Sequence, residues 1–179
     1  MAGKGYSAAR VGISVADRVA GPYRFIRSLR PLAGRWPHDV PAHRRTPETL
    51  AKMTGELDIR TYRGSSYSPM PMFGDFFADG QMVRDMTLFV DDDGTAYHVY
   101  ASEGNSTLQV AELTDAVRDY TGRCARVCPK GFNEAPAICK RGGVSYLIAS
   151  DCTGWEPNAC RAYRAENIFG PWHEIGNPC

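Results

Sequence analysis

The stretch that decides the fold is DMTLFVDDDGTAYHVYA, residues 85–101. Two runs rich in β-branched and aromatic residues flank three aspartates and Gly94, which together are a strong signal for a β-hairpin turn. Two further strands are indicated downstream, one by alternating apolar and polar residues and one by the turn at Thr121 and Gly122 that precedes it. The sequence therefore predicts four short strands in succession, at 86–90, 96–101, 107–113 and 123–128.

The same plan recurs further along the chain. Gly94 corresponds to Gly143 and Tyr97 to Tyr146, with the same offset of 49 residues in both cases. A repeat of this kind with four strands per unit is typical of the blades of a β-propeller, although two similar hairpins in a β-sandwich would share these landmarks. The predicted strands of the second unit are 136–140, 144–149, 159–165 and 171–175.

The N-terminal region is expected to hold the outer half of an earlier blade. Residues 9–16 have a strand pattern, and Gly21-Pro22-Tyr23 parallels Gly170-Pro171-Trp172 of the last unit. The chain is thus predicted to be all-β, a partial β-propeller with roughly two and a half blades. The expected parts of this incomplete domain, 1–179, are outer strands at 1–29, an inserted loop at 30–84 with a short helix at 47–53, a second blade at 85–128 and a third blade at 134–176.

Charge and composition exclude several classes of partner. The formal net charge is +1, which provides no global field for nucleic acid or an anionic membrane. No apolar run is long enough to span a membrane, and no signal peptide is visible. The six cysteines form no C-x-x-C pair and have no histidine at zinc spacing, so no metal site is expected. We expect Cys139, Cys152 and Cys160 to be buried free thiols, although an even count would also permit disulfides in an oxidising compartment.

Two carboxylates share one phase of the repeat. Asp85 precedes the first strand of its unit, and Glu134 precedes the first strand of the next unit. Since equivalent positions of neighbouring blades face the same central channel, both side chains should converge at one mouth. Paired carboxylates in a sugar-sized cavity suit glycoside hydrolysis, where one donates a proton and the other acts through its charge. The alternative is that each acid is a solvated turn residue or a cap.

Other candidate residues lie outside this pair. Trp155 lies in CTGWEPN (152–158), a turn on which an aromatic ring can stack on a sugar face, or alternatively pack under a neighbouring loop. The contiguous aspartates of 91–93 suit a hairpin turn better than a calcium site, which needs spaced oxygen ligands. His98 lies in a strand and is expected to be a packed or surface residue.

These motifs resemble glycoside hydrolase family 43, and more narrowly its galactan β-1,3-galactosidase and β-galactosidase-like subgroup. The residues that carry the resemblance are RDMTLFVDDDG (84–94), NEAPA (133–137), CTGW (152–155) with Pro157 and Asn158, GPW (170–172) and NPC (177–179). The match runs through 5–28 and 81–179, and the motifs combined at this spacing are highly specific.

The resemblance implies a five-bladed propeller that hydrolyses an oligo- or polysaccharide with inversion and without a cofactor. It assigns the general acid to Glu134 and the acid-tuning aspartate to Asp85. The catalytic base of the family has no match and is expected outside this chain, so this fragment by itself is expected to be inactive. A secreted or periplasmic location is implied as well. The residues that fall where the subgroup contacts galactose are Trp155, Thr153, Asn105 and Tyr6.

Three functions are therefore open at this point. The leading one is exo-acting removal of β-galactose from galactan or arabinogalactan side chains. An arabinofuranosidase or xylosidase of the same family is the alternative among enzymes, because specificity depends on pocket loops. A non-catalytic sugar-binding propeller is the alternative of another class, although such a protein needs neither a proton donor nor a carboxylate that tunes it.

Overall fold

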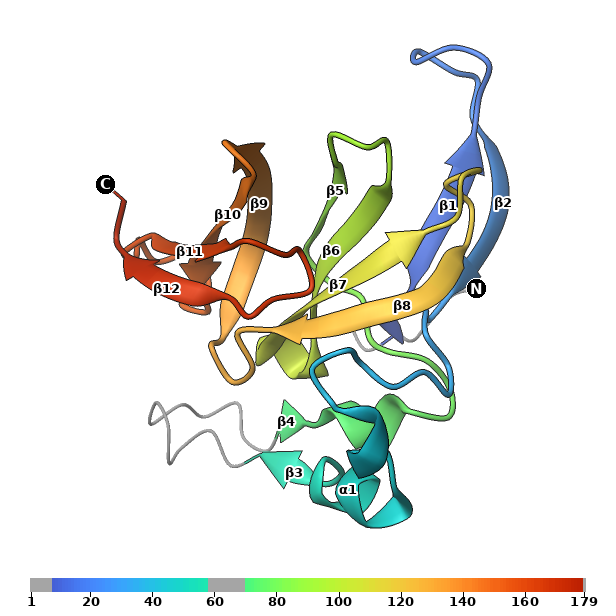
Figure 1. The fold of residues 1–179 in the computed structure, drawn as a ribbon. Coiled ribbons are helices and arrows are strands. Elements are labelled where there is room, and N and C mark those ends of the chain that lie inside the picture. The colour runs from blue at the N-terminus through green and yellow to red at the C-terminus, as the bar shows by residue number, and fades with distance from the viewer. Residues whose placement is uncertain (1–7, 58–69, 179) are drawn as a thin grey trace.

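The computed structural model describes residues 8–57 and 70–178. Two four-stranded antiparallel sheets dominate this part of the chain (Figure 1). In the first sheet, each strand pairs with the strand that follows it in sequence. Its strands are β5 (Met86–Val90), β6 (Ala96–Ser102), β7 (Thr107–Leu113) and β8 (Tyr120–Val127), so four strands lie in the predicted order. The turn predicted at Thr121 and Gly122 is wrong, because β8 begins at Tyr120 and runs through both residues.

The second sheet repeats this order, as the second predicted unit requires. Its last strand begins two residues later than predicted, after Pro171, which has no N–H to donate to the ladder. The strands are β9 (Asn133–Arg141), β10 (Val144–Asp151), β11 (Arg161–Ala165) and β12 (His173–Gly176).

A third sheet precedes these two. It consists of β1 (Val11–Val15) and β2 (Arg24–Leu29), which pair antiparallel from Val11 opposite Leu29. Figure 1 shows the three sheets side by side, with β1 and β2 on the right, β5 to β8 in the middle and β9 to β12 on the left. The first strands of the two larger sheets, β5 and β9, contact each other. This is the arrangement of consecutive propeller blades, whose first strands line the channel.

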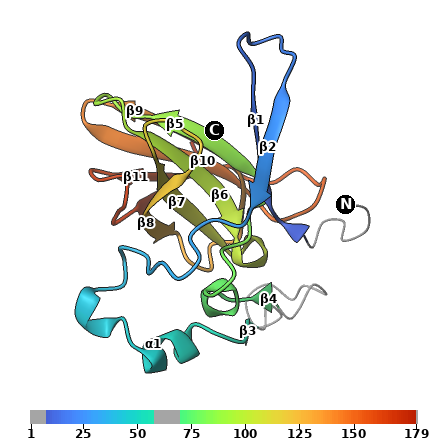
Figure 2. The same ribbon diagram turned by 90° about the vertical axis from the view of Figure 1, so that its right-hand side faces the viewer.

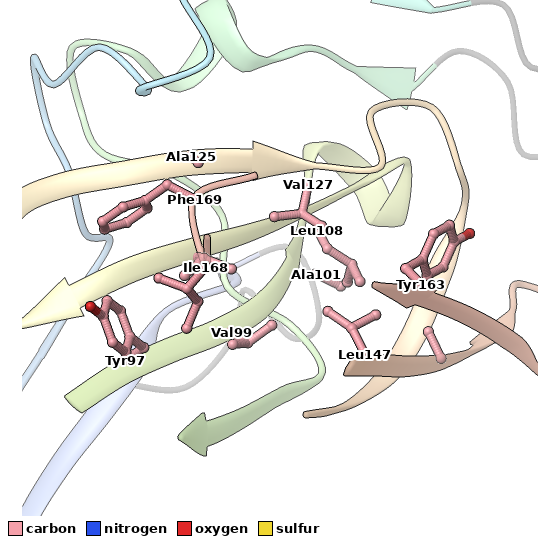
Figure 3. Close-up of a cluster of buried hydrophobic side chains, with 12 residues drawn as sticks. Tyr97, Val99, Ala101, Leu108, Ala125, Val127, Leu147, Tyr163, Ile168 and Phe169 are labelled. Carbon is pink, nitrogen blue, oxygen red and sulfur yellow. The ribbon is translucent and has the colours of Figure 1, made fainter. Parts of the chain in front are cut away.

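The main core lies between the two four-stranded sheets (Figure 3). Val99 and Leu108 of the first sheet pack with Leu147 of the second, and all three side chains are fully buried. Ile168 and Phe169, from the connection between β11 and β12, close the same cluster. Truncating a buried leucine in such a core typically costs about 2–5 kcal/mol, so the two sheets stabilise one another.

The segment between β2 and β5 contains short elements of its own. A helix lies where one was predicted at 47–53, begins at Pro47, and is capped by Thr46, whose hydroxyl accepts the Thr49 N–H at 3.3 Å. In Figures 1 and 2 the segment lies at one end of the sheets, opposite the end where the β1–β2 turn projects. Its elements are η2 (Ala42–Arg44), α1 (Pro47–Lys52), β3 (Glu56–Leu57), β4 (Met70–Pro71) and η3 (Phe73–Phe76).

A buried chain of hydrogen bonds ties this segment to the first large sheet. The Tyr100 hydroxyl donates to Gln109 at 2.9 Å, and the Gln109 amide donates to Gln81 at 3.1 Å. Gln81 in turn donates to the carbonyl of Phe73 at 3.1 Å. Since these polar side chains are almost fully buried, each hydrogen bond prevents an unsatisfied group in the interior. None of the helices in the described ranges is long and apolar enough to cross a membrane.

The expected burial of three thiols is wrong. Cys139 is exposed on β9, and Cys152 and Cys160 are half-buried. Successive strand residues point to opposite faces, and Ile138 is the residue of this pair that packs on the core, so Cys139 points away from it. Cys124 is buried instead, and burial raises the pKa of its thiol to about 12. The structure forms no disulfide among the cysteines it describes.

Candidate active site

Asp85 is held by the backbone at the entrance to β5. Its carbonyl accepts the Ala101 N–H at 2.8 Å, and the N–H of Arg84 donates to the carbonyl of Ala101 at 3.0 Å. These bonds extend the pairing of β5 with β6 beyond Met86 and fix where the carboxylate stands. The side chain of Asp85 is exposed.

Glu134 lies within β9, opposite Ser150 of β10. The preceding residue, Asn133, is fully buried, and its amide oxygen accepts the hydroxyl of Tyr163 at 3.2 Å. Because side chains alternate along a strand, this anchor in the core turns Glu134 to the opposite face. The Glu134 side chain is half-buried there.

A β-bulge follows Glu134 directly. The register of β9 with β10 shifts between the pairs at Glu134 and Ala137, so that Ala135 and Pro136 together oppose Ala149. Ala135 has a positive φ of 47° and Pro136 has no N–H to offer the ladder. Bulges re-aim side chains and are frequent next to active sites.

The bulge brings the two acids together. The N–H of Ala135, released from the ladder, donates to Oδ2 of Asp85 at 3.1 Å. Asp85 therefore lies beside the residue that follows Glu134, and the strands that carry the two acids begin at the same end of the molecule (Figure 1). The structure thus brings Asp85 to the bulge that follows Glu134, near enough for its charge to act on the Glu134 carboxyl. That the two acids share one catalytic site stays a prediction.

A third polar side chain completes this cluster. Nδ2 of Asn105 donates a hydrogen bond to Oε1 of Glu134. Asn105 is only 6% exposed and ends η4 (Glu103–Asn105), the turn that connects β6 to β7. With Oε1 engaged by Asn105, Oε2 is the oxygen of Glu134 that is left to carry a proton.

Left-handed backbone is concentrated around Glu134. In the described part of the chain nine non-glycine residues have positive φ, and six of them lie in 103–105 and 128–135. The two segments meet, because the Phe132 N–H donates to the carbonyl of Ser106 at 3.2 Å. Such backbone costs a non-glycine residue about 1 kcal/mol or more. Its concentration here indicates a functional constraint.

The surroundings of Glu134 favour its protonated form. Partial burial raises the pKa of Glu134, and the charge of Asp85 raises it further. The hydrogen bond from Asn105 and the charge of Arg84 act in the opposite direction, but the pKa stays above the ordinary value of a glutamate. Glu134 is therefore suited to donate a proton, with Asp85 as the neighbouring charge.

The connection 152–160, between β10 and β11, starts beside the same cluster. Ser150 at the end of β10 pairs with Glu134, and Sγ of Cys152 contacts the carbonyl of Asn105 at 3.8 Å. The base of this loop is held by Arg161, whose guanidinium lies 2.5 Å from the carboxylate of Asp151. The loop therefore begins at a fixed position next to the acid.

Trp155 on this loop is fully exposed, so the interpretation that it packs under a neighbouring loop is wrong. The hydroxyl of Thr153 donates to the carbonyl of Glu156 at 2.8 Å and accepts the Asn158 amide at 2.6 Å. Thr153 thereby shapes the loop that presents Trp155. The fourth predicted sugar contact, Tyr6, lies outside the described residues.

Cavities of about 380 and 370 Å³ lie elsewhere, the first beside Asp93 and Glu112 and the second beside Arg164 and His173. In 8–57 and 70–178 there is no group of three or more His, Cys, Asp or Glu side chains that could hold a metal ion. The described cluster offers the carboxyl groups of Asp85 and Glu134 and the amide of Asn105.

Sequence reasoning missed the contact between Asn105 and Glu134. The sugar contact that the family resemblance implies for Asn105 stays a prediction. The available signal was the dipeptide Gly104-Asn105, two residues that tolerate left-handed backbone and so mark a tight turn. No periodic pattern shows where such a turn aims its side chain.

Fold and site together define a β-propeller with coupled carboxylates at one end of its inner strands, which is an arrangement suited to glycoside hydrolysis. The model of glycosyl hydrolases family 43 matches residues 62–178. The chain belongs to this family. No protein with a curated description matches it.

Solved structures of this family are similar over nearly the whole chain. A family 43 β-1,3-galactosidase solved with galactodeoxynojirimycin has 42% identity and a TM-score of 0.79, over 99% of this chain and 51% of that chain. An exo-β-1,3-galactanase from Clostridium thermocellum has 26% identity and a TM-score of 0.69, over 96% and 30%. One from Phanerochaete chrysosporium, solved with galactose, has 26% identity and a TM-score of 0.66, over 97% and 30%. This chain thus spans about half the length of the first and under a third of the other two.

Proposed function

We propose that this chain supplies the proton-donating side of the active site of an exo-acting, inverting β-1,3-galactosidase. The observation that carries the proposal is the coupling of Glu134 to Asp85, in which burial and a neighbouring anion both raise the pKa of Glu134. The proposal is supported by 42% identity to a β-1,3-galactosidase whose structure holds galactodeoxynojirimycin. The similarity to two exo-β-1,3-galactanases supports the same substrate class.

In the proposed reaction, Glu134 donates the proton on Oε2 to the glycosidic oxygen while the bond from that oxygen to the anomeric carbon breaks. The leaving sugar departs as an alcohol, and Glu134 is left as a carboxylate. Water attacks the anomeric carbon from the opposite face and gives up a proton to a base. We propose that this base comes from outside the chain, as the resemblance to the family implies. Solvent then returns a proton to Glu134.

Asp85 and Trp155 take supporting roles in this proposal. Burial and the anionic charge of Asp85 both raise the pKa of Glu134, and the exposed side chain of Asp85 is available to a sugar hydroxyl. The exposed ring of Trp155 offers apolar area for one face of the sugar, with little loss of side-chain entropy.

The test is hydrolysis by the full-length protein that contains this chain. We expect galactose to be released from the non-reducing end of β-1,3-galactobiose and β-1,3-galactotriose, with α-galactose as the first product in a proton NMR time course, as inversion requires. Faster hydrolysis of arabinofuranosides or xylosides would replace the galactosidase assignment. Binding of β-1,3-galactotriose in a calorimeter without any hydrolysis would support the non-catalytic sugar-binding propeller instead.

A further inference from the structure

A buried ion pair lies directly behind the turn that carries Asn105. The guanidinium of Arg126 on β8 donates from Nε to Oε1 of Glu103 at 2.7 Å and from Nη2 to Oε2 at 2.8 Å. The two side chains are 12% and 2% exposed. The pair is therefore bidentate and shielded from water, unlike the ion pairs of an ordinary protein surface.

Stability alone does not explain this pair. Desolvation of two charges offsets most of their attraction, and apolar side chains of similar size are often as stabilising in the same place. The pair also holds an unfavourable backbone, because Glu103, Gly104 and Asn105 have φ values of 51°, 67° and 72°. The turn thus combines the desolvation of a buried ion pair with unfavourable backbone angles. This combination indicates a functional constraint, namely the direction of a side chain on the turn.

The pair fixes both ends of this turn. Glu103 is its first residue, and Oε2 of Glu103 also accepts the hydroxyl of Thr107, which begins β7, at 3.2 Å. At the middle of the turn, a Cβ on Gly104 would lie 2.6 Å from Sδ of Met70, so a side chain there would displace Met70. In the turn held this way, the Asn105 amide points toward Glu134.

We propose that Glu103 and Arg126 form a positioning pair, which holds the Asn105 amide on Oε1 of Glu134 and so selects Oε2 as the oxygen that carries the catalytic proton. The pair touches neither substrate nor Glu134, and it acts through Asn105. The catalytic meaning of the pair rests on the proposed function of Glu134, whereas its effect on the titration of Glu134 does not.

The groups that face Glu134 determine whether its pKa rises or falls when the ion pair is removed. Asp85 before β5 and Asp151 on β10 favour the protonated carboxyl, while Arg84 and the Asn105 amide favour the carboxylate. If the turn loses its direction, the Asn105 hydrogen bond is lost and the two acids remain. The pKa of Glu134 should then rise further.

The experiment replaces the pair by apolar side chains in the double variant Glu103→Met/Arg126→Met of the 179-residue chain. Carbon-13 NMR of the labelled glutamate carboxyls follows the titration of Glu134, whose signal is assigned by its loss in Glu134→Gln. We expect a pKa increase of about half a unit to one unit, with thermal stability close to that of the unchanged chain. A titration of Glu134 that does not move in the folded double variant overturns the proposal.

A control ion pair exists elsewhere on the same sheet. Glu112 on β7 and Arg123 on β8 form an ion pair of 2.5 Å at the other end of the sheet, and Glu112→Met/Arg123→Met should leave the titration of Glu134 unchanged. An equal rise in this control would also overturn the proposal. Asn105→Ala removes the hydrogen bond to Glu134 itself and should therefore give the largest rise in the pKa of Glu134. If the double variant does not fold, Arg126→Lys replaces it, because lysine keeps the charge but loses the bidentate geometry. The pKa of Glu134 should then rise by a smaller amount. A pKa that does not rise in Arg126→Lys contradicts the proposal.

Kinetics of the full-length protein separate this inference from the proposed function. The Glu134 pKa could rise in the double variant although the full-length protein hydrolyses no galactoside. That result would support the positioning pair and contradict the catalytic role of Glu134. In an active enzyme, the same double variant should move the basic limb of the pH–rate profile to higher pH by the amount seen in the titration.

Discussion

The two four-stranded sheets share one plan and differ most in the connection after their second strand. In the first sheet this connection is 103–106, four residues that are all buried and mostly left-handed. In the second sheet it is 152–160, a longer loop that presents the fully exposed Trp155. The short connection turns an amide inward onto an acid, and the long one turns a ring outward to solvent. Repeated strands thus provide a common frame, and unequal loops give the blades different tasks.

The two carboxylates show the same contrast. Asp85 stands before a regular strand and is exposed, whereas Glu134 lies at a bulge and is half-buried. Their common phase explains why they meet. The departure of β9 from regular geometry explains why one of them is suited to carry a proton and the other a charge.

The largest effect is expected when the acid of this pair is removed. In the full-length protein, Glu134→Gln should slow the hydrolysis of β-1,3-galactobiose by roughly a hundredfold to ten-thousandfold, the usual scale for a general acid. The loss should be much smaller for an aryl galactoside with an activated leaving group, which needs less protonation. Steady-state kinetics on both substrates measure this, with exposed Glu166→Gln as the control. Equal losses on the two substrates would mean that Glu134 binds sugar and does not donate a proton.

The second prediction concerns the free energy of unfolding. It tests a buried position at which the two sheets carry different residues. His98 on β6 corresponds to Leu147 on β10, and both are buried. Burial lowers the pKa of His98 to about 4, so its contribution to stability is present above pH 6.5 and is lost as the pH falls from 6.5 toward 4. That loss amounts to about 3 kcal/mol at pH 4. Urea unfolding at pH 7 and pH 4 should therefore show a weaker pH dependence in His98→Leu.

The control for this prediction is a histidine outside the core. His173 on β12 is exposed, so His173→Leu should leave the pH dependence of unfolding nearly unchanged. If His98→Leu leaves the difference between pH 7 and pH 4 as large as in the unchanged chain, acid destabilisation comes from other groups.

The strands and the meeting of the acids could be predicted from the sequence because both depend on periodicity. Alternating apolar residues and the phase shared by Asp85 and Glu134 are visible in any repeat of this length. The direction of Asn105 could not be predicted, because it depends on backbone angles and on a pair between β8 and a turn. The exposure of Cys139 was also missed, since both faces of this strand carry apolar residues and periodicity alone does not show which face is the core.

A third and smaller effect is expected when the neighbouring charge is removed. Asp85→Asn keeps an oxygen to accept the Ala135 N–H but loses the anion that disfavours ionisation of Glu134. The pKa of Glu134 should fall, so the basic limb of the pH–rate profile of the full-length protein should move to lower pH. We expect a loss of roughly tenfold to a hundredfold in kcat near neutral pH. Asp92→Asn, in the exposed turn after β5, is the matched control, and a profile that moves equally in both variants would contradict a specific role for Asp85.

The smallest effect is expected at Trp155, where the long loop of the second sheet is tested alone. Its ring is fully exposed, so Trp155→Ala removes little packing and should change the Tm by no more than about 1 °C. If the ring is a platform for sugar, KM for β-1,3-galactobiose should rise by about threefold to tenfold with little change in kcat, because stacking acts alike on the bound substrate and the transition state.

Trp172 provides the comparison for this last prediction. It packs against the core, and its indole N–H donates to the carbonyl of Ile168 at 3.0 Å. Trp172→Ala should therefore lower the Tm by several degrees. If Trp155→Ala changes binding but not stability, and Trp172→Ala changes stability, the two tryptophans have separate roles. If Trp155→Ala instead lowers the Tm and leaves KM unchanged, its loop is part of the fold and the sugar platform must be sought elsewhere.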